Sequence, residues 1–250
     1  MTSPDLATFL AQLRTGKSPA APIACGRATA LHNTPACSPT LAADIARLAN
    51  RPLPGLTLYK FGSRSIVGSY TLTSGDRIVL KYYYPSNPAK HLHYGINGSR
   101  CHQSWIAGIA LNHLGIPTPP PLLIAEWTRL RGLWVSKSFL ATRPADGIAI
   151  DAFIRTHGTD HPLLQKAAAS LHRSFSIMAA NHAVHGDLKA NNLLLSETGE
   201  VSFIDLDATS FLLPESTWKP LHLRDRTRFH ANWKNNPAAA ELFRNVFPNP

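Results

Sequence analysis

Acidic residues are scarce in this chain. Its 250 residues include 15 Asp and Glu against 25 Lys and Arg, which gives a formal net charge of +10 with neutral histidines. A field of this sign attracts anionic partners such as nucleic acid, anionic lipid head groups or phosphorylated sugars, and it does not choose among them. The charge therefore indicates a class of partner and leaves the fold open.

Cysteine and long apolar runs are also scarce. Three cysteines leave one thiol unpaired in any disulfide scheme and form no CxxC, which favours a reducing compartment. The first 17 residues carry charges and no apolar block, so no secretion signal is expected. The longest uncharged stretch, residues 101–125, contains four prolines that would end a helix near Gly115. We expect a cytoplasmic protein that at most lies on a membrane surface.

Neither disorder nor a fibrous repeat fits a composition that is 44% hydrophobic, with 15 Gly and 20 Pro. The length allows one large domain or two small lobes. Residues 1–50 are expected to be a peripheral N-terminal extension. Two short helices, one reaching Leu13 and one over Leu41–Ala49, would flank a loop of residues 17–40 that is rich in Pro, Ala, Ser and Thr.

The middle of the chain favours strands and the end favours helices. Three short strands are expected over residues 56–84, and the turn at Thr73–Asp76 would place Lys81 roughly opposite Gly68. A helix over Ser99–Leu114 and two further strands, at 122–126 and 133–140, would follow. Beyond residue 144, helices are expected at 150–155 and 163–180. A strand-rich half followed by a helical half predicts an α+β fold with two lobes.

The most informative segment runs from His185 to Asp207. It reads HGDLKANN, then two apolar strands at 193–196 and 201–204 joined by a short turn. An antiparallel hairpin brings the start of its first strand beside the end of its second, which places Asn192 next to Asp205. An amide oxygen beside a carboxylate suits Mg²⁺, which takes its remaining ligands from water and phosphates.

Asp187 and Lys189 precede this hairpin on the loop that enters the same edge. Asp187 could accept a proton from a hydroxyl, and Lys189 could neutralise a transferring phosphoryl group. The order of Asp187, Asn192, strand, turn, strand and Asp205 matches the catalytic loop and metal-binding Asp of protein kinases. The alternative is a core hairpin whose polar ends are simply solvated.

Lys81, at the end of an apolar strand, resembles the kinase lysine that holds the α- and β-phosphates. The bend at 62–68 has the position of the glycine-rich loop that covers the phosphates in kinases. Its candidate phosphate contacts are Gly62, Ser63, Ser65 and Gly68. It lacks the GxGxxG pattern, so an ordinary hairpin turn explains it almost as well.

Together these residues resemble the lipopolysaccharide core (Kdo/heptose) kinase family of the protein-kinase-like superfamily. Beyond the catalytic block, the likeness rests on VLKYY at 79–83, Trp105 with LGIPTP at 114–119, SFLAT at 138–142 and RDRTRF at 224–229. It covers roughly residues 56–247. The resemblance implies a bilobal protein-kinase-like fold with an N-lobe over residues 51–142 and a C-lobe over residues 143–250.

The resemblance also implies a function. It points to ATP and Mg²⁺ as cofactors and to phosphorylation of a Kdo or heptose hydroxyl on an anionic glycolipid, the lipid A–core precursor. Work at the cytoplasmic face of the inner membrane of a Gram-negative bacterium would follow, and the positive charge fits such a surface. Residues 138–142 would form the hinge between the lobes, with the backbone of Phe139 and Ala141 near adenine, although an ordinary strand leading into a loop would give the same pattern.

The sequence departs from the kinase pattern in two places. No acidic residue lies between Arg77 and Ala125, so the usual helix Glu that pairs with the strand lysine is missing, and Gln103 or Ser104 takes the expected position. Gly186 stands where kinases controlled by activation-loop phosphorylation carry an arginine, so regulation by that route is not expected.

Two other functions remain open from the sequence. A small-molecule kinase of the aminoglycoside/choline type shares the HGD motif, but such enzymes favour acidic pockets, whereas this C-terminal half is rich in Lys and Arg. A catalytically silent pseudokinase would explain the missing Glu but not the intact catalytic positions. Arg224, Arg226 and Arg228 are either a solvated face or contacts for an anionic substrate or membrane. Nucleic-acid binding is not expected, because no stacking or recognition motif is present.

Overall fold

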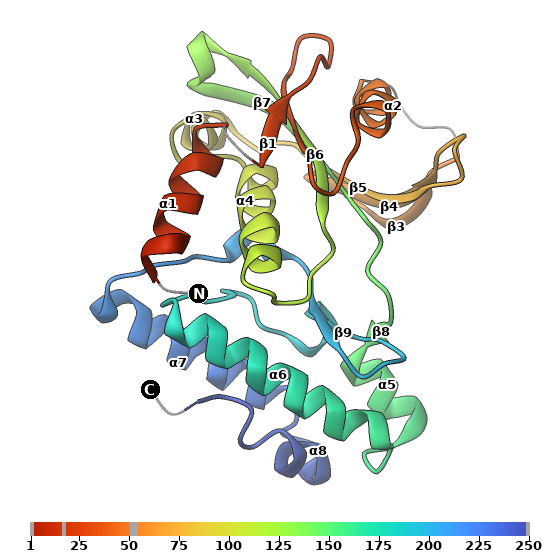
Figure 1. The fold of residues 1–250 in the computed structure, drawn as a ribbon, viewed down its shortest axis with the longest axis vertical. Coiled ribbons are helices and arrows are strands. Elements are labelled where there is room, and N and C mark those ends of the chain that lie inside the picture. The colour runs from red at the N-terminus through yellow and green to blue at the C-terminus, as the bar shows by residue number, and fades with distance from the viewer. Residues whose placement is uncertain (1–2, 17–18, 51–54, 249–250) are drawn as a thin grey trace. The chain divides into compact units, whose positions relative to one another are not determined.

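The computed structural model describes residues 3–16, 19–50 and 55–248. The chain divides into two compact units. The N-terminal unit comprises residues 8–109 and 120–144, and the C-terminal unit comprises residues 1–7, 110–119 and 145–250. The helices α1 (Ser3–Arg14) and α4 (Arg100–His113) have residues in both. The fold is mixed α and β, with most strands in one unit and most helices in the other (Figure 1).

The N-terminal unit is built on one sheet of seven antiparallel strands (Figure 1). In spatial order these are β1 (Ala20–Pro22), β2 (Thr29–Asn33), β6 (Pro121–Arg129), β7 (Trp134–Thr142), β5 (Arg77–Tyr83), β4 (Ser65–Thr71) and β3 (Thr57–Phe61). The helix α2 (Pro39–Ala49) belongs to the same hydrophobic core as the sheet, in which Ile45, Leu80 and Phe139 are fully buried. Burial of these side chains is the main stabilising term of the unit.

The segment 17–40 is more ordered than its composition predicts. Residues 17–18 lie outside the described residues, but β1 and β2 form within the expected loop, and β2 pairs with the long strand β6. Cys25, Cys37 and Ala42 belong to the sheet's core. The expectation of a peripheral extension was therefore wrong, because long-range pairing supplies what these short, proline-flanked strands lack locally.

The helix that precedes α4 was not predicted from the sequence. α3 (Pro88–Asn97) precedes α4, begins with an Asn87 cap and Pro88 in its first turn, and has no buried residue. Its apolar residues Leu92 and Ile96 are four apart, as on one face of a helix, but they are exposed and too few to identify the helix from the sequence. The ring of His91 stacks on Trp134 at 4.5 Å and donates a hydrogen bond from Nδ1 to the Val135 carbonyl at 2.7 Å, which attaches α3 to β7.

The C-terminal unit is mainly helical. Its helices are α5 (Ile150–His157), α6 (Pro162–Ala180), α7 (Glu215–Ala231) and α8 (Pro237–Leu242). A small antiparallel sheet has the order β10 (Val201–Phe203), β9 (Leu193–Leu195) and β8 (Ile148–Ala149). Phe175 of α6 makes edge contacts with both Phe203 of β10 and Phe229 of α7, at 5.7 and 5.8 Å between centroids. This aromatic core fixes β10 and α7 around the segment between them.

Beside β10 runs the segment after α4. The Pro117 carbonyl accepts from the backbone N–H of Phe203 at 2.9 Å, and the Thr118 hydroxyl donates to the Phe203 carbonyl at 2.7 Å. Together these bonds hold the end of β10 in place, just before Asp205. Within the described residues, no helix is long and apolar enough to cross a membrane.

Candidate active site

The loop from His185 to Asn192 enters the small sheet of the C-terminal unit. It follows an isolated bridge between Val184 and Ser210 and ends in the 3₁₀ turn η2 (Ala190–Asn192), directly before β9. Its first turn requires glycine, because Gly186 has φ +82° and a Cβ atom there would lie 2.4 Å from the Ala208 carbonyl oxygen. The loop is therefore packed tightly against the segment that follows Asp205.

Asp225 of α7 holds the start of this loop. Its Oδ2 accepts the backbone N–H groups of His185 at 2.8 Å and Gly186 at 2.9 Å, and its side chain is buried. A carboxylate that accepts two amide hydrogens forms charge-assisted bonds, which are stronger than neutral ones. Asp225 thus fixes the backbone of the two residues that precede Asp187.

The carboxylate of Asp187 is held by two cations. Lys189 Nζ lies 2.8 Å from Oδ2, and Arg228 Nη1 lies 2.7 Å from Oδ1. Partial burial raises the pKa of Asp187, but the hydrogen bond and charge of Lys189, together with the charge of Arg228, outweigh it, and the pKa is lowered from its usual value. Asp187 is therefore ionised at neutral pH.

Asn192 and Asp205 come together as the sequence predicts. The backbone N–H of Ile204 donates to the Asn192 carbonyl at 3.0 Å, and Leu193 pairs with Phe203. Asn192 Nδ2 donates to the Asp187 carbonyl at 2.9 Å, so its Oδ1 is the atom left to act as a ligand. Asp205 follows the hairpin in a left-handed conformation, φ +60°, and begins the 3₁₀ turn η3 (Leu206–Ala208).

His185 links the loop to the end of this hairpin. Its Nδ1 accepts the backbone N–H of Asp187 at 3.3 Å, so its Nε2 carries the proton that is donated to the Ile204 carbonyl at 3.1 Å. Burial lowers the pKa of His185, which keeps the ring neutral. The histidine thus links the backbone of Asp187 to the residue before Asp205.

The donor set at the hairpin end fits magnesium better than zinc. Across the described residues, no three His, Cys, Asp or Glu side chains gather in a way that could hold a metal alone. One amide oxygen and one carboxylate form an incomplete hard-oxygen set, and Mg²⁺ completes such a set with waters and phosphate oxygens. Asn192 and Asp205 therefore fit a cation that arrives with a nucleotide.

In the N-terminal unit, Lys81 lies in β5 between β4 and β7. It pairs with Val67 on one side and Leu140 on the other, while Gly68 pairs with Leu80. The predicted register, with Lys81 opposite Gly68, was one residue off. Because side chains alternate between faces, this shift places Gly68 on the face opposite to that of Lys81.

The glycine-containing bend serves packing at one of its positions. A Cβ atom on Gly68 would lie 2.6 Å from the Thr57 carbonyl of β3. The strand β4 therefore requires glycine where it lies against β3. Gly62 and Ser63 occupy the turn between β3 and β4, where the Gly62 N–H donates to the Ser65 carbonyl at 3.1 Å. Ser65 itself is buried and opens β4.

The predicted hinge is a strand. Residues 138–142 form the second half of β7, with β5 on one side and β6 on the other as far as Thr142. Phe139 and Ala141 are fully buried, and the Phe139 ring packs on Tyr82 at 4.9 Å between centroids. After β7 the chain stays in the N-terminal unit as far as Pro144, two residues beyond the expected segment.

Neither residue at the missing helix Glu position is acidic or strongly exposed. Ser104 is buried in α4, and Gln103 donates from Nε2 to the Asn97 carbonyl at 2.6 Å, which ties α4 to the end of α3. Gln103 therefore has a structural role.

Sequence reasoning missed how α7 supports the site. The RDRTRF motif drew attention to its arginines, but their partners lie about 40 residues earlier in the chain and leave no local pattern. The motif forms a helix in which Asp225 and Arg228 both contact the catalytic loop. The recurrence of the motif in the resembled family was the one available signal.

The model of the family described as "Lipopolysaccharide kinase (Kdo/WaaP) family" matches residues 81–241, a span that begins at Lys81 and includes the catalytic loop and the whole of α7. The chain belongs to this lipopolysaccharide kinase family. It is accordingly a kinase, a phosphotransferase that uses ATP, and the aminoglycoside/choline and pseudokinase alternatives give way to this family.

The fold is also seen in solved structures. The structure titled "WaaP in complex with acyl carrier protein" is 19% identical to this chain, with a TM-score of 0.52, and the match covers 80% of this chain and 90% of that one. No curated protein matches the chain at the threshold applied.

Proposed function

We propose that this kinase transfers the γ-phosphoryl group of ATP to a Kdo or heptose hydroxyl in the inner core of lipopolysaccharide. The observation that carries the proposal is the convergence of Asp187, Lys189, Asn192 and Asp205 around one end of the β9–β10 hairpin, in a chain of the lipopolysaccharide kinase family. Phosphoryl transfer depends mainly on positioning and charge stabilisation, and these residues supply both.

Asp187 accepts the proton of the attacking hydroxyl. The new bond joins the sugar oxygen to phosphorus, the bond from phosphorus to the leaving oxygen of ADP breaks, and the proton passes to the Asp187 carboxylate. His185 and Asp225 hold the backbone that carries this carboxylate. Lys189, 2.8 Å from Asp187, offers a positive charge to the phosphoryl group as it moves.

Asn192 and Asp205 would hold Mg²⁺ through Oδ1 of the amide and the carboxylate. Bound there, the ion neutralises phosphate charge. The left-handed backbone of Asp205 turns the chain immediately after β10, and the Thr118 bond to Phe203 fixes where that turn begins. The protein thus sets the carboxylate position before any nucleotide arrives.

The nucleotide contacts in the N-terminal unit are part of the same proposal. Lys81 would pair with the α- and β-phosphates, and the bend with Gly62, Ser63, Ser65 and Gly68 would cover them. The burial of Phe139 and Ala141 moves the proposed adenine contacts to the backbone just after Thr142. In this interpretation the two units correspond to the strand-rich and helical lobes of a protein-kinase-like fold.

We further propose that the acceptor is an anionic glycolipid of the lipid A–core type, phosphorylated at the cytoplasmic face of a membrane. An exposed surface supports this. The apolar tip, defined as four exposed side chains on α3 and the β6–β7 turn, comprises Leu92, Ile96, Leu130 and Leu133. The two segments are in contact, since a Cβ atom on Gly95 would lie 2.1 Å from the Leu133 carbonyl.

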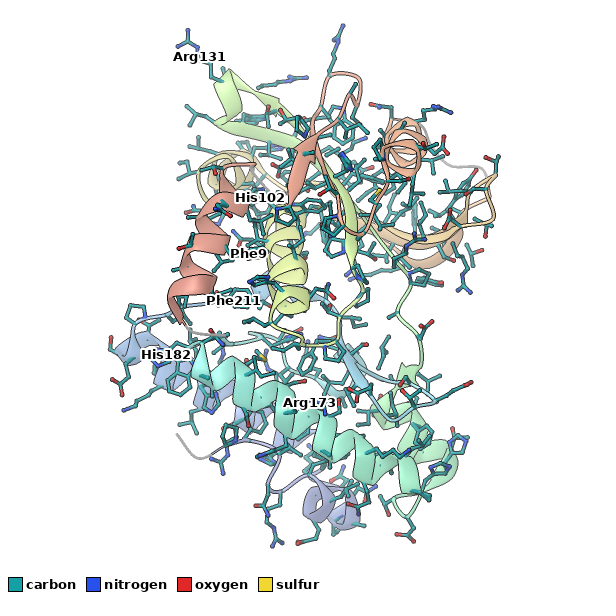
Figure 2. The ribbon with its side chains drawn as sticks, viewed as in Figure 1. Phe9, His102, Arg131, Arg173, His182 and Phe211 are labelled. Carbon is teal, nitrogen blue, oxygen red and sulfur yellow. The ribbon has the colours of Figure 1, made fainter. Side chains whose placement is uncertain are left out.

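Two arginines lie next to the apolar tip in the sequence. Arg129 and Arg131 flank Leu130, and Figure 2 shows Arg131 at the outer end of the β6–β7 turn, extending away from the strands. Neither α3 nor residues 129–134 contain an acidic residue. Leu130 is 69% exposed and has φ +53°, an unfavourable conformation for leucine. Apolar side chains within a basic surface complement an anionic bilayer.

Replacing Leu130 and Leu133 together with Ser is expected to weaken binding to vesicles that contain anionic lipid, by about 10-fold or more. Binding should also fall as salt rises, since the Debye length shortens from roughly 10 Å at 0.1 M to about 3 Å at 1 M. Vesicle co-sedimentation measures both effects. Leu223→Ser, at an exposed leucine of α7, is the matched control and should bind as the wild type does.

Equal binding by the double variant and the wild type would contradict the membrane contact. Because the similar WaaP was solved in complex with acyl carrier protein, binding of an acyl carrier protein to both variants is measured separately, by titration calorimetry. If the double variant lost binding to an acyl carrier protein but kept vesicle binding, the apolar tip would be a protein-binding surface instead.

The function itself is tested by incubating the protein with ATP, Mg²⁺ and candidate core glycolipids. Mass spectrometry should detect one added phosphate on a Kdo or heptose residue, dependent on all three components. Transfer to small soluble alcohols, with none to glycolipids, would contradict the proposal.

A further inference from the structure

Two arginines of α7 converge on the catalytic loop. Arg228 Nη1 donates to the Gly186 carbonyl at 3.0 Å and to Asp187 Oδ1 at 2.7 Å. Arg224, one helical turn earlier, donates from Nη2 to the same Gly186 carbonyl at 3.4 Å. Residues four apart lie on one face of a helix, so the two guanidinium groups are neighbours there. Both side chains are at least partly exposed, with the Arg228 side chain 38% accessible.

These contacts restrain the base. Lys189 holds one oxygen of Asp187 and Arg228 holds the other, so each carboxylate oxygen already has an ion-pair partner. Each oxygen has a second lone pair, so a hydroxyl that approaches Asp187 must enter beside a cation that is already bound to that oxygen.

Arg228 still has donors for another anion. Both of its hydrogen bonds to the loop use Nη1. A guanidinium group has five N–H donors, and the edge formed by Nε and Nη2 matches the two oxygens of a carboxylate or phosphate. Arg224 adds a second positive charge beside it. Arginine is the side chain best suited to such bidentate recognition.

Building on the proposed function, we propose that Arg228 and Arg224 form a subsite for an anionic group of the acceptor, a carboxylate or phosphate near the target hydroxyl. A group bound at the Nε–Nη2 edge shares the charge of the Arg228 guanidinium, which weakens its hold on Asp187 Oδ1 and leaves that oxygen to accept the hydroxyl proton. The hydroxyl oxygen then forms its bond to the γ-phosphorus as the bond to ADP breaks, and Asp187 holds the proton. A neutral acceptor leaves Arg228 on Asp187 and reacts slowly.

The structure separates this pair from the third arginine. At about 100° per residue, Arg226 lies roughly 200° around α7 from both Arg224 and Arg228. It makes neither of the contacts with Gly186 that the other two make. Arg226→Gln therefore removes the same charge from the same helix outside the subsite, which makes it the matched control.

The test compares kcat/KM for paired acceptors. One pair is a Kdo-bearing glycolipid and its carboxyl methyl ester; the other is a core glycolipid with and without its phosphate groups. For the wild type we expect the neutralised member of at least one pair to react about 10–100-fold more slowly, the usual effect of a hydrogen bond to a charged group. The pair that responds identifies the anion.

Arg228→Gln is expected to reduce that ratio to about one, because the subsite for the anionic group is gone. Arg224→Gln should lower the ratio less, and Arg226→Gln should leave it unchanged. Arg228→Gln slowing both members of a pair equally would overturn the proposal and make Arg228 a support of the loop only. Equal rates for both members with the wild type would overturn it too, whereas no transfer to any glycolipid would instead contradict the proposed function.

Discussion

Asp205→Asn is expected to abolish Mg²⁺-dependent phosphoryl transfer while the fold remains intact. Asp205 is the carboxylate of the proposed metal pair, and an amide in its place offers no negative charge to the ion. Loss of several kcal/mol of charge stabilisation corresponds to a rate about a thousandth of the wild-type value or less. Asn adopts the left-handed backbone that Asp205 has, so the turn into η3 should form unchanged.

Turnover of ATP at a range of Mg²⁺ concentrations measures this effect, and thermal unfolding checks the fold. Asp160→Asn makes the same change of charge at an exposed position between α5 and α6 and should retain full activity. Normal turnover by Asp205→Asn at ordinary Mg²⁺ would contradict the metal assignment.

The second large effect is expected for Asp187→Asn. Its rate of transfer should fall by about 10²–10⁴, the usual share of a positioned general base, while its affinity for ATP stays nearly the same. An amide cannot accept the hydroxyl proton and also loses the ion pairs with Lys189 and Arg228. Single-turnover kinetics and equilibrium nucleotide binding separate the two quantities.

A collapse of ATP affinity with normal chemistry per bound nucleotide would make Asp187 a structural or metal-binding residue. The pH dependence gives a second check. Because its cationic partners lower the pKa of Asp187, this base stays ionised as pH falls through the ordinary Asp range near 4, and it loses function only below that range. An acid limb attributable to Asp187 at higher pH would show that the ion pairs are absent in solution.

The catalytic hairpin could be predicted because its information is local. Alternating apolar runs, a four-residue turn and the polar residues at both ends specify that Asn192 and Asp205 meet, and the observed pairing of Leu193 with Phe203 agrees. Neither Asp225 nor Arg228 could be placed in the same way. Their contacts with the loop span about 40 residues, and only the packing of α7 brings them there.

Errors elsewhere have equally physical causes. The strands β1 and β2 are short and lie in a proline-rich segment, so their stability comes from pairing with the distant strand β6. The helix α3 has no buried face, and its two exposed apolar residues, Leu92 and Ile96, give only a weak helical pattern. The register at Lys81 was off by one residue, because the composition of a turn does not specify which pair closes it.

Gly186 also limits the kinds of phosphorylation control that could arise in this enzyme. Where the protein-kinase superfamily uses a phosphorylated activation segment, an arginine before the catalytic Asp receives the phosphate. Here a side chain at that position would collide with the Ala208 carbonyl, so a single substitution could not introduce such a receiver. A lineage with this backbone is closed to that switch unless the turn after Asp205 is rebuilt at the same time.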